Sequence, residues 1–365
     1  GEKDDGQPRV ASTWRERPGR VRVDFPPREE PARLKVKETY SRGWTATNEE
    51  GDPLGVTVED GAFIGVDVPP GTIQVRLEYE PLGWIPGLSL AGLGLILFTL
   101  LLFKTIGRQK VVTTLLSPTG MAILACLLFM VVGRTASRSW SSTFDESYHL
   151  TRGLVRVVEK DSRMSYFHPP LQNIFQGAGA ALAKGHSMVY PGGSNWDIAS
   201  VGGYASDIIA VNKQDYPEAV RAARWGTVLF GCLLCLVAVR WAYTAAGPVA
   251  GGLAGLGVAL NPTVLAHGNL ATTDMGVTAL AMAGLYALWL GVHRHRGALG
   301  MATLFFVLAA GAKFTGLIWL LSYLLLVLPV LAYHQRNRLV LLQAPAAVLL
   351  FLVMLVALYG LEPQT

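Results

Sequence analysis

The chain has 365 residues, of which 51% are hydrophobic and 16% charged, and its formal net charge is +5. A soluble domain of this size carries about a quarter charged residues, so the composition excludes an ordinary soluble protein. The net charge does not indicate nucleic-acid binding, because much of it lies in short loops between apolar runs, as in membrane proteins.

The charge is unevenly distributed: residues 1–80 are rich in Arg, Glu, Lys and Asp, whereas residues 85–360 are mostly apolar. We therefore expect a water-exposed domain followed by a membrane domain. The chain begins with Gly1, no signal peptide opens it, and its last apolar run stops just before Leu361. We expect a fragment that is open at both ends.

Residues 1–83 are expected to form a small extracytoplasmic β-domain. Residues 1–30 are rich in Pro, Arg and Glu, which predicts an extended or loosely ordered segment. Apolar residues alternate with polar ones from Leu34 and again over residues 73–79, a pattern typical of half-buried antiparallel strands. Turn signals separate these runs. The pattern predicts a sandwich-like all-β domain of about five strands with a binding or structural role.

This segment carries three short motifs, namely E-T-Y-x-x-G-W (Glu38 to Trp44), G-A-F (Gly61 to Phe63) and V-P-x-G (Val68 to Gly71). Followed by an apolar run, they resemble the extracytoplasmic β-domain that closes YfhO-type bacterial membrane proteins. The resemblance covers residues 33–105.

Eight apolar runs follow, several of them close to the roughly 20 residues that a bilayer requires. They lie near residues 85–103, 112–133, 222–243, 249–265, 273–292, 298–312, 314–333 and 339–360. Only helices satisfy all backbone groups of a spanning segment of this kind, so we expect a multi-spanning α-helical bundle of about eight spans. Residues 84–111 form a linking helix and loop, and residues 112–365 form the main membrane domain.

Three basic clusters orient the bundle. They are Lys104, Arg108 and Lys110; His293, Arg294, His295 and Arg296; and Arg336 and Arg338. With eight spans these clusters lie on one side, which the positive-inside rule makes cytoplasmic. The β-domain and the loop 134–221 then face outward, and residues 171–184 form an amphipathic surface helix.

Cysteine occurs at Cys126, Cys232 and Cys235, always inside an apolar run. The C-x-x-C spacing of the last two has no second pair and no nearby histidine. We interpret all three as packing residues rather than a metal or redox site.

Four polar features share the outer side of the expected bundle: the adjacent Asp145 and Glu146, His168 in a His-Pro-Pro motif, the turn from His267 to Asp274, and Lys313. Each has a structural alternative. The adjacent carboxylates could belong to a solvated loop, and the His-Pro-Pro motif could be a helix start. His267 could be a packing histidine, Asp274 a helix cap, and Lys313 a lysine that snorkels to the headgroups. Ionisable groups at a membrane boundary are nevertheless costly, which favours function for Asp274 and Lys313.

The motifs FDESYH (144–149), FHPPL (167–171), NPTVLAHGNLATTDM (261–275) and GAKFTGL (311–317) occur in this order between the expected helices. Together they resemble bacterial members of the dolichyl-phosphate-mannose–protein mannosyltransferase family. These are GT-C glycosyltransferases that use polyprenyl-phosphate sugars. The resemblance covers residues 112–360 and implies a GT-C-like bundle in the bacterial inner membrane, with its active site facing outward.

The resemblance implies roles for individual residues. Asp145, with Glu146 beside it, falls on the carboxylate held to be the general base. A departing lipid phosphate needs a cation rather than an acid, for which Lys313 is the first choice. Alternatives are Arg152, Arg156 and Arg163 in the outer loop. The family's donor-site motifs fall on His168, His267 and Asp274.

No cofactor is assigned, because the spacing of Asp145, Glu146, His168, His267 and Asp274 has no metal-ligand signature, although these side chains could converge on a divalent ion. The acceptor stays open among a protein, a lipid and an envelope glycan. Two other functions also stay open. One is a transporter with Asp274 and Lys313 in its path, although no internal symmetry supports it; the other is a non-catalytic envelope scaffold.

Overall fold

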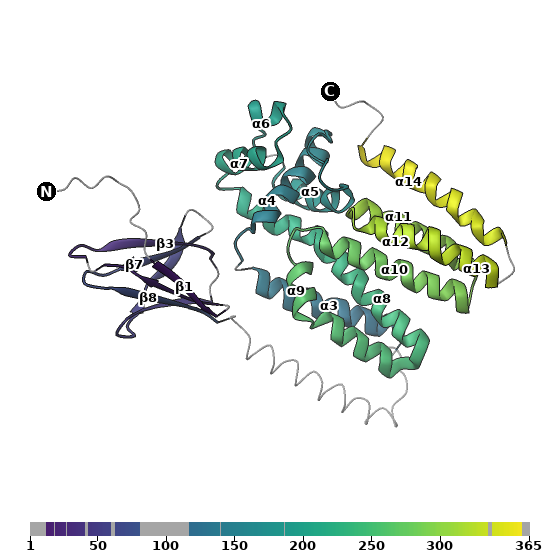
Figure 1. Cartoon of the computed structure of the whole chain (residues 1–365), viewed down its shortest axis with the longest axis horizontal. Helices are drawn as coiled ribbons and strands as arrows, with labels where there is room; N and C mark the ends of the chain where they lie inside the picture. Colours follow the sequence, from purple (N-terminus) through teal and green to yellow (C-terminus); the bar gives the residue numbers. More distant parts are fainter. Residues whose placement is uncertain are drawn as a thin grey trace. The chain divides into compact units, whose positions relative to one another are not determined.

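The computed structural model describes residues 12–80 and 117–359, apart from residues 18, 27, 41–42, 60–62, 139, 186 and 335–337. These residues belong to two compact units, a β-domain that also takes in residues 138–141 and a helical domain (Figure 1). Each unit is described by itself below.

The described part of the β-domain contains eight strands in two antiparallel sheets. They are β1 (Ser12–Arg17), β2 (Arg20–Asp24), β3 (Ala32–Thr39), β4 (Trp44–Asn48), β5 (Pro53–Leu54), β6 (Val56–Glu59), β7 (Phe63–Val68) and β8 (Gln74–Tyr79). The strand order is β1-β2-β8-β4-β5 in one sheet and β3-β7-β6 in the other. The last described strand, β8, ends at Tyr79, and residues 81–116 lie outside the described part.

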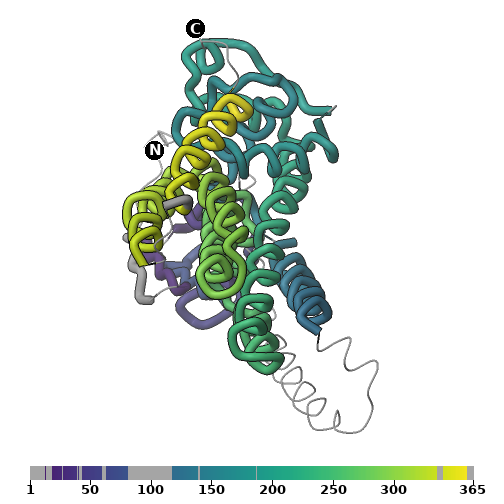
Figure 2. The backbone as a smooth tube through the Cα atoms, turned by 90° about the vertical axis from the view of Figure 1, so that its right-hand side faces the viewer, coloured from purple at the N-terminus to yellow at the C-terminus, as the bar shows by residue number. Residues whose placement is uncertain are grey.

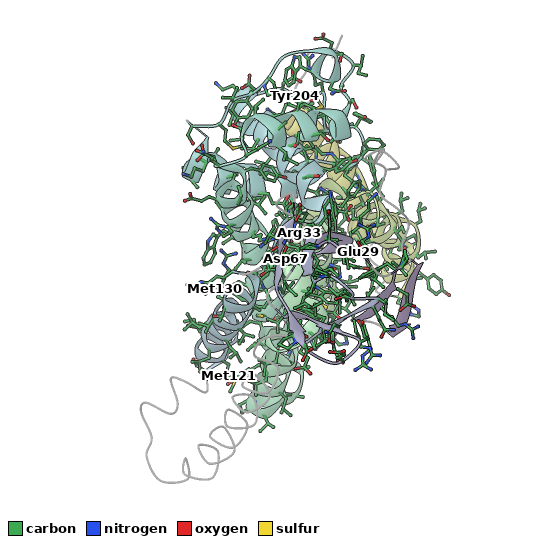
Figure 3. The ribbon with its side chains drawn as sticks, turned by 90° about the vertical axis from the view of Figure 1, so that its left-hand side faces the viewer. Glu29, Arg33, Asp67, Met121, Met130 and Tyr204 are labelled. Carbon is green, nitrogen blue, oxygen red and sulfur yellow. The ribbon has the colours of Figure 1, made fainter. Side chains whose placement is uncertain are left out.

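One apolar core joins the two sheets. Val23 and Leu77 come from the first sheet and Ile64 and Val66 from the second, and all four are at most 1% exposed. Because the two sheets share this core, the domain is a small β-sandwich. On the second sheet, Arg33 pairs with Asp67 and with Glu59, and Figure 3 labels the first two.

Two expectations about the β-domain were wrong. The first thirty residues are not loosely ordered throughout, because β1 and β2 occupy residues 12–24, and residues 1–11 lie outside the described part. The number of strands also exceeds five. In β2, buried Val21 and Val23 alternate with arginine and aspartate and pair with Leu77 and Val75 of β8. The high Pro and Arg content of residues 1–30 made the alternation hard to recognise in the sequence.

The helical domain contains the remaining described elements. They are α3 (Pro118–Ser137), α4 (Phe144–Leu154), η1 (Val155–Glu159), α5 (Leu171–Lys184), α6 (Ser194–Asp197), α7 (Val201–Val211), α8 (Tyr216–Ala259), α9 (Pro262–Gly268), α10 (Asp274–His293), α11 (Ala298–Ala312), α12 (Gly316–Ser322), η2 (Tyr323–Val327), α13 (Leu328–His334), η3 (Arg338–Leu342) and α14 (Gln343–Tyr359). In Figure 1, α3, α8, α10 and α11 run alongside one another, and α3–α8 and α10–α11 are contacting pairs.

Within the described residues, five helices are long and apolar enough to cross a membrane. They are Pro118–Ser137, Tyr216–Ala259, Asp274–His293, Gly316–His334 and Val340–Tyr359. Their lipid-compatible surface is extensive; less than a quarter of the apolar window of the last two is buried inside the protein. The helical membrane character predicted from hydropathy is therefore supported at this level.

The predicted count of about eight spans exceeds what the described residues show. The run 85–103 lies outside them, and α11 has only 15 residues. The runs 222–243 and 249–265 fall on the two arms of α8, which are separated at Gly247 by its non-helical conformation (φ 86°) before Pro248. The second arm ends at Ala259, so the run 249–265 is not one continuous helix. A second break at Asn261 starts α9. Hydropathy counts apolar length rather than continuous helix, so the run 249–265 extends across this second break.

The predicted outer loop 134–221 folds into α4, η1, α5, α6 and α7, which gather at one end of the helical domain together with the last turn of α14 (Figure 2). A helix over the predicted residues 171–184 is confirmed as α5, and one of its faces is buried inside the helical domain. α4 and α5 cross where Gly153 meets Gly177; a Cβ added to Gly177 would lie 2.1 Å from the backbone of Gly153. This close crossing brings the polar side chains of both helices together.

Candidate functional site

The two adjacent carboxylates at the start of α4 have opposite environments. Thr143 is the N-cap of the helix, and its backbone N–H and hydroxyl donate to the Glu146 carboxylate in a capping box. Asp145 is exposed, whereas Glu146 is fully buried. Only Asp145 can therefore meet a molecule that arrives from outside.

Glu146 is held by a set of donors from distant segments. Arg224 of α8 donates from Nε and Nη2 to its two oxygens, both at 2.8 Å, and the backbone N–H of Ala271 donates at 2.8 Å. A third guanidinium nitrogen of Arg224 donates to the carbonyl of Ser137 at the end of α3. Glu146 thus joins α3, α4, α8 and the turn before α10. This arrangement assigns it a structural rather than a catalytic role, unlike the expectation from the sequence.

Arg152, two turns beyond Asp145, is a buried cation without a paired carboxylate in the described part of the chain. It is 4% exposed, and its Nε has no hydrogen-bond partner among the described residues. Its guanidinium lies over the ring of Phe167, 5.6 Å from the centroid. Burial lowers the pKa of Arg152, and Tyr166, Tyr148 and Asp145 oppose that effect. A buried guanidinium with an open donor is suited to bind an anion.

His149 and His168 lie beside this guanidinium, with their rings stacked at a centroid distance of 6.1 Å. Burial lowers the pKa of His149 to about 3, and the charge of Arg152 adds to the effect. Burial also lowers the pKa of His168, helped by Arg152 and Lys313. Both rings are therefore neutral near pH 7. The Nδ1 atom of His168 is buried without a hydrogen-bond partner in the described part, and so keeps a donor or acceptor available.

Asp274 and Lys313 form an ion pair at 2.6 Å between the first turn of α10 and the end of α11. Helix α11 ends at Ala312, so Lys313 lies in a non-helical junction before α12. The Lys313 side chain is 23% exposed and that of Asp274 47% exposed. The pair borders the site and leaves part of both groups accessible.

Three buried polar side chains of α5, namely Gln172, Asn173 and Gln176, form a polar row with hydrogen bonds to the helices that carry these groups. Asn173 Nδ2 contacts His149 Nδ1 at 3.1 Å, and Gln176 donates to Thr227 of α8 at 2.9 Å. Gln172 accepts from the backbone N–H of Gly276 in α10 at 2.7 Å. The row therefore ties α4, α8 and α10 to one helix, and it makes the positions of His149 and Asp274 interdependent.

Electrostatic influence shows which expected residues converge. The charges of Arg152, Lys313, Asp274 and Asp145 all affect the pKa of His168, so charged groups from α4, the first turn of α10 and the junction after α11 lie in the neighbourhood of this histidine. His267 is exposed on α9 and interacts electrostatically with Asp274 at the edge of this group. We call Asp145, Arg152, His168, Asp274 and Lys313 the polar cluster.

Two further arginines named from the sequence are engaged elsewhere. Arg163 pairs with Asp161 at 2.8 Å, and its guanidinium lies over the Trp196 ring. Arg156 donates to the carbonyls of Leu358 and Ala357 and so caps the end of α14. Neither is placed to bind a ligand of the polar cluster.

The sequence did not point to Arg224, His149 or the polar row of α5. A charged residue inside the predicted span 222–243 was the available signal for Arg224, because such a residue needs a partner. The signal for the row was polar side chains at positions 172, 173 and 176, one face of a helix.

The described residues contain no group of three or more His, Cys, Asp or Glu side chains placed to hold a metal ion. The three cysteines are free, and the Cys126 thiol donates to the carbonyl of Cys232 at 3.3 Å, a packing contact between α3 and α8. Comparison of the chain with protein-family models, with curated proteins and with solved structures finds no match.

Proposed function

We propose that the protein is a membrane glycosyltransferase of GT-C type that takes a sugar from a polyprenyl-phosphate carrier. The observation that carries the proposal is the polar cluster: an exposed carboxylate, Asp145, lies near a buried cation, Arg152, that has no paired carboxylate among the described residues, at one end of an apolar helical domain. A water-soluble acceptor and a lipid-bound donor meet at such a boundary.

The reaction is one displacement at the anomeric carbon. The acceptor hydroxyl oxygen attacks this carbon as its bond to the phosphate oxygen breaks, and the configuration inverts. Asp145 takes the hydroxyl proton as general base. The bonding electrons leave with the lipid phosphate, which is already a weak base and needs charge stabilisation rather than a proton.

Arg152 is the better candidate for holding the departing phosphate. Lys313, the first choice from the sequence, is already paired with Asp274 at 2.6 Å. Arg152 is buried, keeps Nε unsatisfied in the described part, and can offer a planar fork of donors to phosphate oxygens. His168 is neutral, and its Nδ1 atom has no hydrogen-bond partner among the residues that the structure describes, so it can supply a further hydrogen bond to the phosphate or a sugar hydroxyl.

The proposal places the protein in a bacterial inner membrane with the polar cluster outside, where the positive-inside rule puts the end opposite to His293–Arg296. The acceptor is a protein, a lipid or an envelope glycan. Acceptor contacts come from loops, which the shared chemistry of the site does not determine.

Transport of a polar solute is the second candidate, which the pair of Asp274 and Lys313 favours. An ion pair between two apolar helices next to a helix break can exchange partners as a solute passes. In this case Asp145 would have no chemical role.

The decisive experiment uses the purified chain in proteoliposomes with a polyprenyl-phosphate hexose that is labelled in the sugar. The transferase hypothesis expects time-dependent loss of label from the lipid, to water or to an added acceptor. Labelled solute in the vesicle lumen without cleavage of the lipid supports transport instead. If neither cleavage of the lipid nor uptake of solute is observed, only a scaffold role remains and the proposal is overturned.

A further inference from the structure

An aromatic ladder lies at the end of α10 opposite to Asp274. Tyr286, Trp289 and His293 follow one face of the helix; Tyr286 and Trp289 stack with an interplanar angle of 20°, and Trp289 and His293 with 28°. Trp241 of α8 joins them, 5.9 Å from the Tyr286 ring and 6.5 Å from Trp289. None of these four side chains is buried in the core.

Along α10, the ladder residues lie 12 to 19 positions beyond Asp274, which corresponds to about 18–29 Å of helix. α10 has 20 residues, which corresponds to about 30 Å of helix, the thickness of a hydrocarbon core. Tyrosine and tryptophan concentrate at membrane interfaces, where the ring contacts lipid chains and the polar atom contacts headgroups and water. The Tyr286 hydroxyl, 3.3 Å from that of Thr244, already has a polar neighbour.

Three exposed arginines frame the ladder: Arg240 next to Trp241, and Arg294 and Arg296 just after α10. The sequence offers them no counter-ion nearby, because Asp274 is the only acidic residue between Ala219 and Leu361. Asp274 lies at the far end of α10 and is paired with Lys313. These helices therefore present a net positive surface that an anion from outside them can pair with.

We infer that this end of α8 and α10 binds the headgroup of an anionic glycerophospholipid. Arg240, Arg294 and Arg296 pair with the lipid phosphates, while Trp241 and Trp289 pack on the glycerol and upper acyl chains. Basic residues between helices at the cytoplasmic side of a membrane provide the charge for such binding. The inference does not depend on the proposed transfer reaction.

Native mass spectrometry of the full chain tests this site, with phosphatidylglycerol and phosphatidylcholine of identical acyl chains titrated separately. The wild-type protein should retain phosphatidylglycerol in preference to phosphatidylcholine. The triple variant Arg240→Gln, Arg294→Gln and Arg296→Gln should bind phosphatidylglycerol about tenfold or more weakly, since each basic residue near a membrane surface contributes about 1 kcal/mol, or roughly fivefold.

A matched control neutralises three exposed cations of the other end: Lys160→Gln, Lys213→Gln and Arg221→Gln. It removes the same charge and should keep the lipid preference. The double variant Trp241→Leu and Trp289→Leu should weaken retention of the lipid while the charge is unchanged. Equal binding of both lipids by the wild type, or an equal loss in the control and the Arg240 triple variant, would overturn the assigned site.

Discussion

Arg224 and Glu146 form a bidentate ion pair with both nitrogen–oxygen distances at 2.8 Å, and neither side chain has any exposed surface. They lie 78 residues apart in sequence. The pair connects the start of α4 to α8, and the Ala271 N–H connects it to the turn that precedes Asp274. One buried interaction therefore sets the spacing between two parts of the polar cluster.

Removal of one partner of this pair should destabilise the helical domain strongly. Arg224→Met leaves the Glu146 carboxylate buried and uncompensated, which costs about 3–5 kcal/mol for buried pairs. Thermal denaturation in detergent should show a clearly lower midpoint. The double variant Glu146→Leu and Arg224→Met should recover part of the loss.

Lys184→Gln is the control for this prediction, because Lys184 pairs with Asp215 and Glu218 on the surface. Its midpoint should remain close to that of the wild type. A drop as large as that of Arg224→Met would argue against a special role for the buried pair.

Asp145→Asn should abolish transfer without loss of folding. An amide cannot accept the hydroxyl proton, and a positioned general base contributes about 10²–10⁴-fold in rate. The rate of label loss from a polyprenyl-phosphate hexose measures the effect. Asp197→Asn, which changes another exposed carboxylate of the same loop region, should be silent. Near-normal turnover by Asp145→Asn would rule out the assigned base.

Arg152→Gln should raise the KM for the lipid donor roughly 10–100-fold, the loss expected when a hydrogen bond to a charged group is removed. Arg152→Lys should recover part of the affinity, because the charge remains but the planar fork of donors is lost. Arg163→Gln, at an arginine paired with Asp161 and stacked on Trp196, serves as the control and should leave KM unchanged.

The stability of the helical domain should fall as the pH is lowered from about 6.5. Burial lowers the pKa of His149 to about 3, below the value of about 6.5 for an unfolded chain. The unfolded state therefore binds a proton in this window that the folded state excludes, at roughly 1.4 kcal/mol per pH unit. The contribution is complete above pH 6.5 and is lost toward pH 3.

His149→Gln removes this titration while its side-chain oxygen can still accept from Asn173. Melting midpoints measured between pH 4 and pH 8 should vary less for this variant than for the wild type. An unchanged pH profile would show that other groups determine the acid sensitivity.

Hydropathy and periodicity predicted much of the fold. The runs near 273–292 and 314–333 correspond closely to the helices Asp274–His293 and Gly316–His334, and α5 occupies the predicted residues 171–184. The runs near 222–243 and 249–265 anticipated the two arms of α8 on either side of Gly247. The end of the second arm at Ala259 and the separate helix α9 from Pro262 could not be read from averaged hydropathy. The strands of residues 12–24 were missed because residues 1–30 are rich in Pro and Arg, and because β2 pairs not only with its neighbour β1 but also with β8, about fifty residues further along the chain.

The candidate site was predictable in its members but not in its connections. Short motifs singled out Asp145, His168, Asp274 and Lys313, and the structure brings them around His168. The partner of each charge was not predictable, because partners such as Glu146 and Arg224 meet only after four helices pack. The sequence shows which charged residues would be costly to bury, but only the packed structure shows which partner compensates each charge.

The capping box of α4 has a consequence for the direction of Asp145. Successive residues of an α-helix are rotated by about 100° around its axis. Glu146 closes the box with Thr143 and is also fixed by Arg224, so it locks the rotational phase of the first turn. The neighbouring carboxylate is thereby aimed outward, and a substitution at Glu146 should turn Asp145 away from its target even where the helix itself survives.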